Sequence, residues 1–498
     1  MPFRFSTIIL IFIALFGGAI YILHLFNLVT ASNEVYARFT ALGIFIAGFG
    51  FLGWQKARHH RFSWDDIYKN NTLIIVALTV LLVGLFLDRR IGHYMTGVFA
   101  GVSLLHLAYT RKFYFPPKFF YFVVGYTLLL LVGTLLGEPS GLRYLDKTLP
   151  FYVFPLAFCC FRLSKKNLFD IADVFFKTSI IFLSLCVLYW WFNFLHLDAD
   201  LTGWIASKTF YHAEMTGWLR QADMLNVMIR NKYELHEFTH FSAYFFVNSW
   251  AHYFHPTYVS FTLISGLILG FYLHHKRKAA KRDLILYIVL CFSVIALMQS
   301  RIGIVGLFFT LAFTGLYYLK LTFKRRYFVV GIAMYLLLGS AGAFVFKNEI
   351  SEFKDDDIRD GIRMVTISYI QENFWRGAGM RRERAALEQQ AEKIREQLPA
   401  NIFPNNYYHT IVHAHNQFLG DMVQFGIWGL TALLAMLTAI AHYAIKNRSY
   451  LLQMLLGVLL LLMMIDSPLY GQSYRVLAIL FFFTAISESV KLKLKNEI

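Results

Sequence analysis

Long apolar segments dominate this chain and restrict its fold more than any other feature. The runs that begin at Thr7, Tyr327 and Tyr450 each reach the length of about 17–25 residues that an α-helix needs to cross a bilayer. The sequence is 57% hydrophobic and only 15% charged, whereas soluble domains carry about 25% charged residues. Lipid is therefore the main solvent of the chain, and the sequence predicts an all-α, polytopic membrane protein.

We expect about 14 transmembrane helices, with a range of 12–14. The first run lacks a small-residue cleavage site and is soon followed by a second, so we interpret it as a span and not as a signal peptide. The spans are predicted near residues 7–29, 36–54, 72–88, 92–109, 118–136, 149–162, 173–195, 256–273, 283–299, 302–320, 327–346, 416–445, 450–466 and 474–490.

The basic residues indicate the orientation of these spans. With the N-terminus inside, the loop "HHKRKAAKR" and the tail "KLKLK" both face the cytoplasm, and few Lys or Arg residues remain in the outer loops. Both termini are therefore expected to be cytoplasmic. The formal net charge of +17 is largely a consequence of this topology, and it gives no reason to expect a nucleic-acid partner.

Two outer segments are too long to be simple connections, and they divide the chain into five parts. The expected parts are N-terminal transmembrane helices (1–197), a first outer loop (198–255), central transmembrane helices (256–346), a second outer loop (347–415) and C-terminal transmembrane helices (416–498).

The second outer loop contains a charged segment with a narrow apolar stripe. Leu387, Ala391, Ile394 and Leu398 recur at helical spacing, which predicts a surface helix over 381–401 that stops near Pro399. A solvated lid or spacer is the favoured interpretation of this helix, and direct contact with a substrate is the alternative.

Ionisable residues at membrane depth are costly and are therefore candidates for function. Arg301 stands at the outer junction of two apolar runs, where it can bind either a lipid-linked phosphate or an ordinary lipid headgroup. His255 precedes Pro256 at the start of a span, and a packing role and a site role are both open. Arg359 and Arg363 are four residues apart and share one helix face, so they can grip a diphosphate or pair with nearby aspartates.

The segment "HAHNQFLGDMVQFGIWG" places polar residues where the second outer loop enters an apolar run. An imidazole at His415 can accept a proton near neutral pH, and Asn416 follows it. Gly426 and Gly429 are three residues apart, which permits close helix contact in a membrane. We therefore expect a rigid helix that presents His415 at its outer end, with His413 as a bystander.

These motifs together resemble the O-antigen ligase family and its relatives, the O-antigen polymerases and the pilin-type protein O-oligosaccharyltransferases. The ligase pattern is a His, then Asn, Ser or Gln, nine residues, Gly, two residues and Gly. His415, Asn416, Gly426 and Gly429 match this pattern position for position.

The upstream segment "RDGIRMVTISYIQENFWRGAG" is similar to an Arg-led segment of the family that ends in a glycine turn. Arg359 takes the arginine position, and Asn373, Gly377 and Gly379 take the turn. Two departures concern the loop shape: Phe374 replaces the usual proline and Arg363 replaces a tryptophan. "QSRIG" at Arg301 and "FHPTY" at His255 are also similar to family segments, so the resemblance covers roughly residues 240–470.

The resemblance implies a GT-C-like fold in a bacterial inner membrane, with two long periplasmic loops and the active site on the periplasmic side. It implies an inverting, metal-independent glycosyl transfer without a cofactor, from glycan-linked undecaprenyl diphosphate to lipid A–core. His415 would then be the base, with Arg301 and Arg359 as the catalytic cations and Arg363, Asn416 and His255 as substrate-binding residues.

Three alternatives stay open from the sequence. An O-antigen polymerase would use a second lipid-linked glycan as acceptor, and a protein O-oligosaccharyltransferase would use a secreted protein. A lipid-linked glycan flippase belongs to another class, but transporters usually carry their polar residues near the bilayer midplane, whereas these residues gather at one face.

Overall fold

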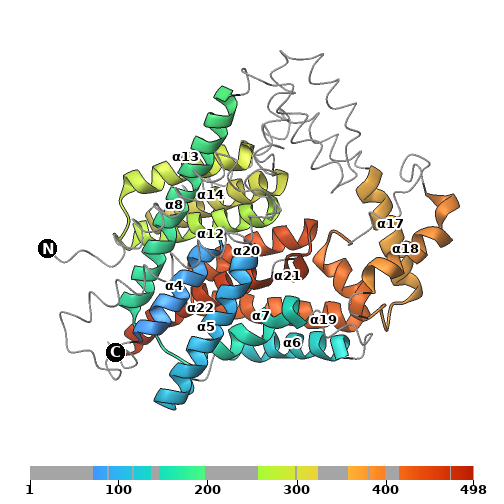
Figure 1. Ribbon diagram of the computed structural model, residues 1–498, viewed down its shortest axis with the longest axis horizontal. Coiled ribbons are helices and arrows are strands. Elements are labelled where there is room, and N and C mark those ends of the chain that lie inside the picture. Colours follow the sequence, from blue (N-terminus) through green and yellow to red (C-terminus); the bar gives the residue numbers. More distant parts are fainter. Residues whose placement is uncertain are drawn as a thin grey trace. The chain divides into compact units, whose positions relative to one another are not determined.

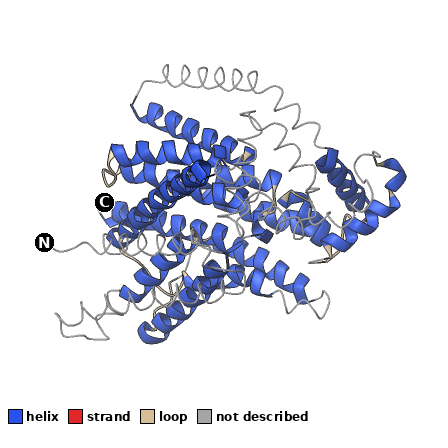
Figure 2. Ribbon diagram, turned by 45° about the horizontal axis from the view of Figure 1, so that its top comes forward, coloured by secondary structure: helices blue, strands red, loops and turns tan. Residues whose placement is uncertain are grey.

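The computed structural model describes residues 71–86, 89–114, 117–135, 145–196, 256–297, 300–322, 357–379, 382–398, 414–471 and 473–496. Within these residues the chain forms helices and loops and no strand (Figure 2). The all-α prediction is therefore confirmed for the described part of the chain. The first outer loop, His255 and His413 lie outside it.

Two compact units make up the fold. Unit 1 holds α4 (Thr72–Gly84), α5 (Arg89–Thr110), α8 (Lys165–His196) and most of α13 (Lys281–Leu297), and α4 packs on both α5 and α8. Unit 2 holds α6 (Phe120–Leu135), α7 (Leu145–Ala157), most of α12 (Pro256–His275), α14 (Arg301–Thr322), α17 (Asp357–Glu372), α18 (Glu383–Lys393), α19 (Gln417–Lys446), α20 (Tyr450–Ile465), α21 (Pro468–Gly471) and α22 (Ser473–Asn496).

The predicted spans coincide with helices wherever the structure describes them. Of the 14 predicted spans, three (7–29, 36–54 and 327–346) lie outside the described residues, and each of the other 11 falls on a helix. The closest agreement is α20, predicted as 450–466 and observed as Tyr450–Ile465.

Two described helices are long and apolar enough to cross a membrane by length and composition, Thr257–His275 and Gln417–Lys446. Further helices carry large apolar side chains on their exposed faces. Water makes such contiguous apolar faces costly, whereas lipid does not, so the exposed faces fit a membrane protein. Examples are Tyr94, Val98 and Leu105 on α5, Tyr121, Leu128 and Val132 on α6, and Ile285, Val289 and Phe292 on α13.

Helices α17 and α18 lie side by side (Figure 1) around a small hydrophobic core. The stripe predicted over 381–401 supplies four of the nine buried residues of this core: Leu387 and Ala391 are fully buried, and Ile394 and Leu398 are nearly so. The helix is shorter than predicted, because α18 ends at Lys393 and continues only as a 3-10 turn over Arg395–Gln397. Val423 of α19 joins the same core, which seats the pair on α19.

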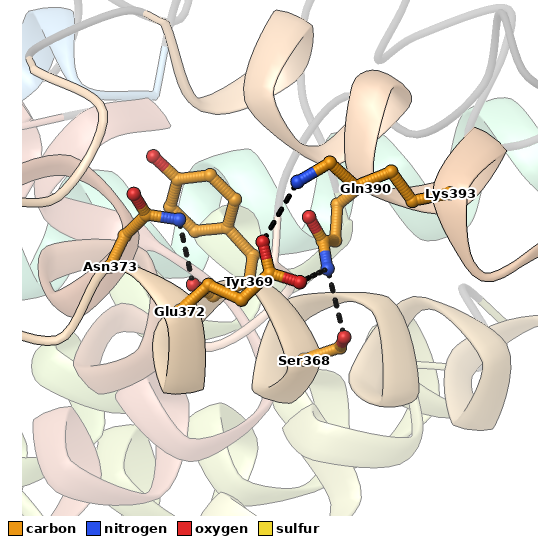
Figure 3. Close-up of polar contacts among 6 residues, drawn as sticks. All are labelled: Ser368, Tyr369, Glu372, Asn373, Gln390 and Lys393. Atoms are coloured by element: carbon orange, nitrogen blue, oxygen red, sulfur yellow. Dashed lines mark hydrogen bonds and ion pairs between the residues drawn. The ribbon is translucent and has the colours of Figure 1, made fainter.

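A polar contact also ties α18 to α17 (Figure 3). The Glu372 carboxylate accepts hydrogen bonds from Lys393 Nζ at 2.8 Å and Gln390 Nε2 at 2.9 Å, and Gln390 Nε2 also reaches Ser368 Oγ at 2.9 Å. The Lys393 and Gln390 hydrogen bonds hold the pKa of Glu372 below its ordinary value of 4.5. The contact therefore favours the ionised carboxylate.

We predict that Glu372→Gln weakens the pairing of α17 and α18 in a pH-dependent way. Because the folded pKa is depressed, the stabilisation is fully present above the unfolded value of 4.5 and is lost as the pH falls through the folded value. Amide hydrogen exchange of α18, corrected for intrinsic rates, should be faster in the variant at neutral pH and equal to wild type in acid. Glu388→Gln is the matched control, since Glu388 pairs with Arg384 inside α18 alone; equal effects of both variants would contradict the role of Glu372.

Candidate functional site

The membrane segment that follows the second outer loop is broken near its start. Helix α19 runs from Gln417 to Lys446, but Gly426 has φ 62° and ψ −153°, which is outside any helical region. The helical span predicted over 416–445 is therefore interrupted at this point. A nine-residue helix precedes the break, and the stretch after it, from Ile427 to Lys446, is about 30 Å long at 1.5 Å per residue.

A loop from the end of α17 replaces the helical hydrogen bonds that the break removes. Ala378 N donates to Val423 O at 2.6 Å, Gly379 N to Gln424 O at 2.8 Å, and Ile427 N to Phe374 O at 2.9 Å. Ile427 would bond to Val423 O in an unbroken helix. The loop 373–379 thus satisfies backbone groups that would otherwise be orphaned, which is a strict requirement in an apolar setting.

Glycines allow this contact to be close. A Cβ at Gly377 would lie 2.6 Å from Gly426 N, and a Cβ at Gly426 would lie 2.6 Å from the Trp375 backbone. Gly377 and Gly379 both have positive φ, a backbone conformation that favours glycine. A Cβ at Gly429 would lie 2.6 Å from Asp421 O, so Gly429 lets the two halves of α19 approach each other.

The backbone is fixed on both sides of His415. Ala414 N donates to the buried Glu383 Oε1 at 2.8 Å. On the other side, Asn416 Oδ1 caps α19 by accepting from Phe418 N and Leu419 N, while its Nδ2 donates to Met464 O at 2.9 Å. His415 between them has φ 48° and an exposed side chain.

This arrangement holds an imidazole at the surface in a backbone conformation that costs a non-glycine residue about 1–2 kcal/mol. Strained backbone conformations of this kind persist only where the surrounding structure maintains them, and they cluster at functional sites. The described hydrogen bonds of Asn416 are structural, so its predicted contact with a substrate stays a prediction.

A buried carboxylate lies within the short first half of α19. Asp421 is fully buried and accepts hydrogen bonds from Tyr126 of α6 at 2.9 Å, from Gln417 Nε2 at 2.8 Å and from Tyr470 of α21. Gln417 Oε1 in turn accepts from Leu469 N at 3.0 Å. This network fixes α6, α19 and α21 to one another, because a buried carboxylate must keep its hydrogen-bond donors.

The start of α14 and the Asn416 cap next to His415 both contact helix α20. Ser300 immediately precedes α14 and accepts from Ser260 Oγ of α12 at 2.9 Å. Ile302 and Gly306 of α14 line a small cavity with Leu461 and Leu462 of α20. Two residues further on, Met464 O holds Asn416. The backbone of Arg301 and the backbone next to His415 therefore both lie toward the C-terminal end of α20.

The predicted arginines divide into two groups. Arg363 is an exposed residue of α17. Arg301 and Arg359 are in the first turns of α14 and α17, but their side chains lie outside what the structure describes, so their approach to His415 stays a prediction. Arg359 is at the opposite end of α17 from the 373–379 loop.

Three buried charged residues were missed by the sequence reasoning. Asp421 and Arg475 stand inside apolar runs, and this signal alone could have identified them. Arg475 is 1% exposed in the first turn of α22 and donates from Nε to Tyr474 at 2.8 Å. Glu383 is one charge among many in a polar segment, so no sequence signal distinguishes it. Among the described residues, no group of three His, Cys, Asp or Glu side chains is placed to hold a metal ion.

Residues 286–434 match the family model described as O-Antigen ligase. The matched stretch contains Arg301, Arg359, the 373–379 loop, Glu383, His415 and the break at Gly426. It confirms the resemblance to this family over these residues and supports a function in glycan transfer of the ligase or polymerase type. A comparison with curated proteins found no match.

We predict that Gly426→Ala destabilises unit 2 more than either of two other glycine substitutions. Gly379→Ala meets no atom within 4 Å and should cost only the positive-φ penalty of about 1–2 kcal/mol, whereas Gly426→Ala adds a collision with the Trp375 backbone. Gly125→Ala, in open space on α6, should be neutral or stabilising by up to about 1 kcal/mol. Thermal unfolding of the purified variants in detergent measures the order, and a Gly426 variant as stable as the Gly125 variant would contradict the break.

Proposed function

We propose that this chain is an O-antigen ligase that transfers a glycan from undecaprenyl diphosphate to lipid A–core on the periplasmic face of a bacterial inner membrane. One observation carries the proposal: the backbone that carries the exposed His415 is fixed on one side by the bond from Ala414 N to Glu383 and on the other by the Asn416 cap. The family match over residues 286–434 supports the class of reaction.

The reaction needs a base at a fixed position. The oxygen of an acceptor hydroxyl attacks the anomeric carbon of the donor sugar and inverts its configuration, and the bond from that carbon to the diphosphate oxygen breaks. The bonding electron pair leaves with undecaprenyl diphosphate, and His415 takes the proton of the acceptor hydroxyl. A fixed backbone supports this role, because a misplacement of about 1 Å can cost roughly 100-fold in rate.

The leaving diphosphate gains negative charge as the bond breaks, and preorganised cations stabilise that charge. Arg301 and Arg359 fill this role in the proposal, with Arg363 and His255 as further substrate-binding residues, so that the transfer proceeds without a metal ion. The position of the Arg301 backbone beside the C-terminal part of α20 supports its inclusion.

An O-antigen polymerase or a protein O-oligosaccharyltransferase would use the same centre with a different acceptor. Deletion of the gene in its host separates them: loss of long lipopolysaccharide chains with accumulated lipid-linked glycan indicates a ligase, and core with a single repeat indicates a polymerase. Normal lipopolysaccharide with altered glycoproteins indicates the protein transferase, and donor stranded in the cytoplasmic leaflet indicates a flippase.

We predict that His415→Gly and His415→Ala both lose transfer by roughly 100- to 10,000-fold, the usual contribution of a general base. The His415→Gly substitution relieves the positive-φ strain at this position, but it also raises the conformational entropy of the unfolded chain. Because these two effects oppose each other, the free energy of unfolding of this variant should stay within about 1 kcal/mol of wild type. Arg359→Ala should lose roughly 100- to 1,000-fold through lost charge stabilisation. Purified protein with undecaprenyl diphosphate-linked glycan and lipid A–core provides the assay, with Arg384→Ala as control; full activity of the His415 variants would refute the base.

We further predict that Glu383→Gln lowers kcat and leaves KM for the donor nearly unchanged. A glutamine keeps the size of Glu383 but offers one acceptor oxygen to two donors, Ala414 N and Gln424 Nε2. Because the loosened backbone is the one that carries His415, the fall should be about 10- to 100-fold. Glu392→Gln, at an exposed position of α18, is the control. A change in KM alone would show that Glu383 does not position His415.

A further inference from the structure

Helix α17 has a second apolar face that its core does not use. Its inner face places Ile362, Val365 and Tyr369 in the core shared with α18. Its outer face carries Met364 and Ile367, which are 44% and 42% exposed. A helix on the surface of a water-soluble domain normally places polar residues on its outer face, so this side of α17 is adapted to another environment.

Two exposed aromatic residues lie in the turn that follows the end of α17. Phe374 is 39% exposed and Trp375 is 65% exposed, and their rings meet edge to face with centroids 5.3 Å apart. They follow Met364 and Ile367 along the chain, just beyond the end of α17 at Glu372. Arg363 and Arg376, both exposed, are next to this apolar strip in the sequence.

The strip is fixed to the membrane segment of the chain. Ile427 N donates to Phe374 O at 2.9 Å, and the Trp375 backbone lies against Gly426. Trp428, 62% exposed, stands in the first turn of the apolar stretch that follows the break. Trp375 and Trp428 are therefore held at the same end of a candidate membrane span, which is where tryptophan is enriched in membrane proteins.

We propose that the outer face of α17, made of Met364, Ile367, Phe374 and Trp375, lies in the headgroup layer of the bilayer together with Trp428. Arg376 then faces the lipid phosphates, since a cation beside an interfacial apolar strip favours anionic lipid. The lipid surface is the partner because the strip is continuous with a membrane span and carries positive charge at its edge.

The consequence is that α17 and α18 dock on the membrane instead of projecting from it. The docked pair brings Glu383, and with it the backbone of His415, to the depth at which lipids expose their polar groups. The proposal depends on insertion of the chain in a membrane and not on the transfer reaction, so the two can fail separately.

The test uses the full chain with a nitroxide at Ile367→Cys or Trp375→Cys, reconstituted in vesicles of phosphatidylethanolamine and phosphatidylglycerol. The control carries the label at Glu392→Cys, an exposed position of α18. The described native cysteines Cys159, Cys160, Cys186 and Cys291 are buried, and the unsubstituted protein gives the background. Power saturation compares the access of oxygen, which concentrates in lipid, with that of a water-soluble nickel chelate.

We expect the ratio of oxygen access to nickel access to be several-fold higher at 367 and 375 than at 392. Water-like access at both 367 and 375 overturns the proposal, and so does a label shielded from both reagents, which would indicate a protein or glycan partner on this face. Two label sites keep the result independent of damage by either substitution.

Discussion

The contact between the 373–379 loop and the break in α19 is the interaction on which the rest of the site depends. A helix that opens inside an apolar environment exposes backbone groups that water cannot satisfy, at a cost of several kcal/mol for each group. Here Ala378, Gly379 and Phe374 supply the missing partners. The break and the loop therefore stabilise each other, although about 50 residues separate them in the chain.

The break determines what the first half of α19 can do. As a separate short helix, it is free to lie against α18, α20 and α21, and a Cβ at Gly420 would contact both Tyr470 and Glu383 Oε1. Two buried carboxylates, Asp421 within this short helix and Glu383 of α18, form described hydrogen bonds that link α18 and α19 to each other and α19 to α6 and α21. Burying carboxylates is expensive unless their donors are rigidly placed, so the same contacts that satisfy them also restrict the backbone at His415.

The sequence predicted the helices well and the site only in part. Apolar length and periodicity are local properties, which is why α20 and the buried side chains of α18 agree with expectation. The break at Gly426 could not be predicted in this way, because the surrounding run is apolar on both sides of the glycine and the partner loop is distant. Gly426 and Gly429 indicated close packing correctly, but the packing involves the 373–379 loop and the first half of α19 itself.

Of the buried charged residues, one could be recognised from its neighbours in the sequence and another only from the folded structure. Asp421 could have been identified, since an acid inside an apolar run is unusual whatever lies around it. Glu383 is ordinary in its own segment, and only the fold of α18 against α19 brings it to Ala414. Because Val423 of α19 also completes the core of α17 and α18, this pair of helices cannot pack without also placing Glu383. The apolar core of the outer segment thus sets the polar contact that holds His415.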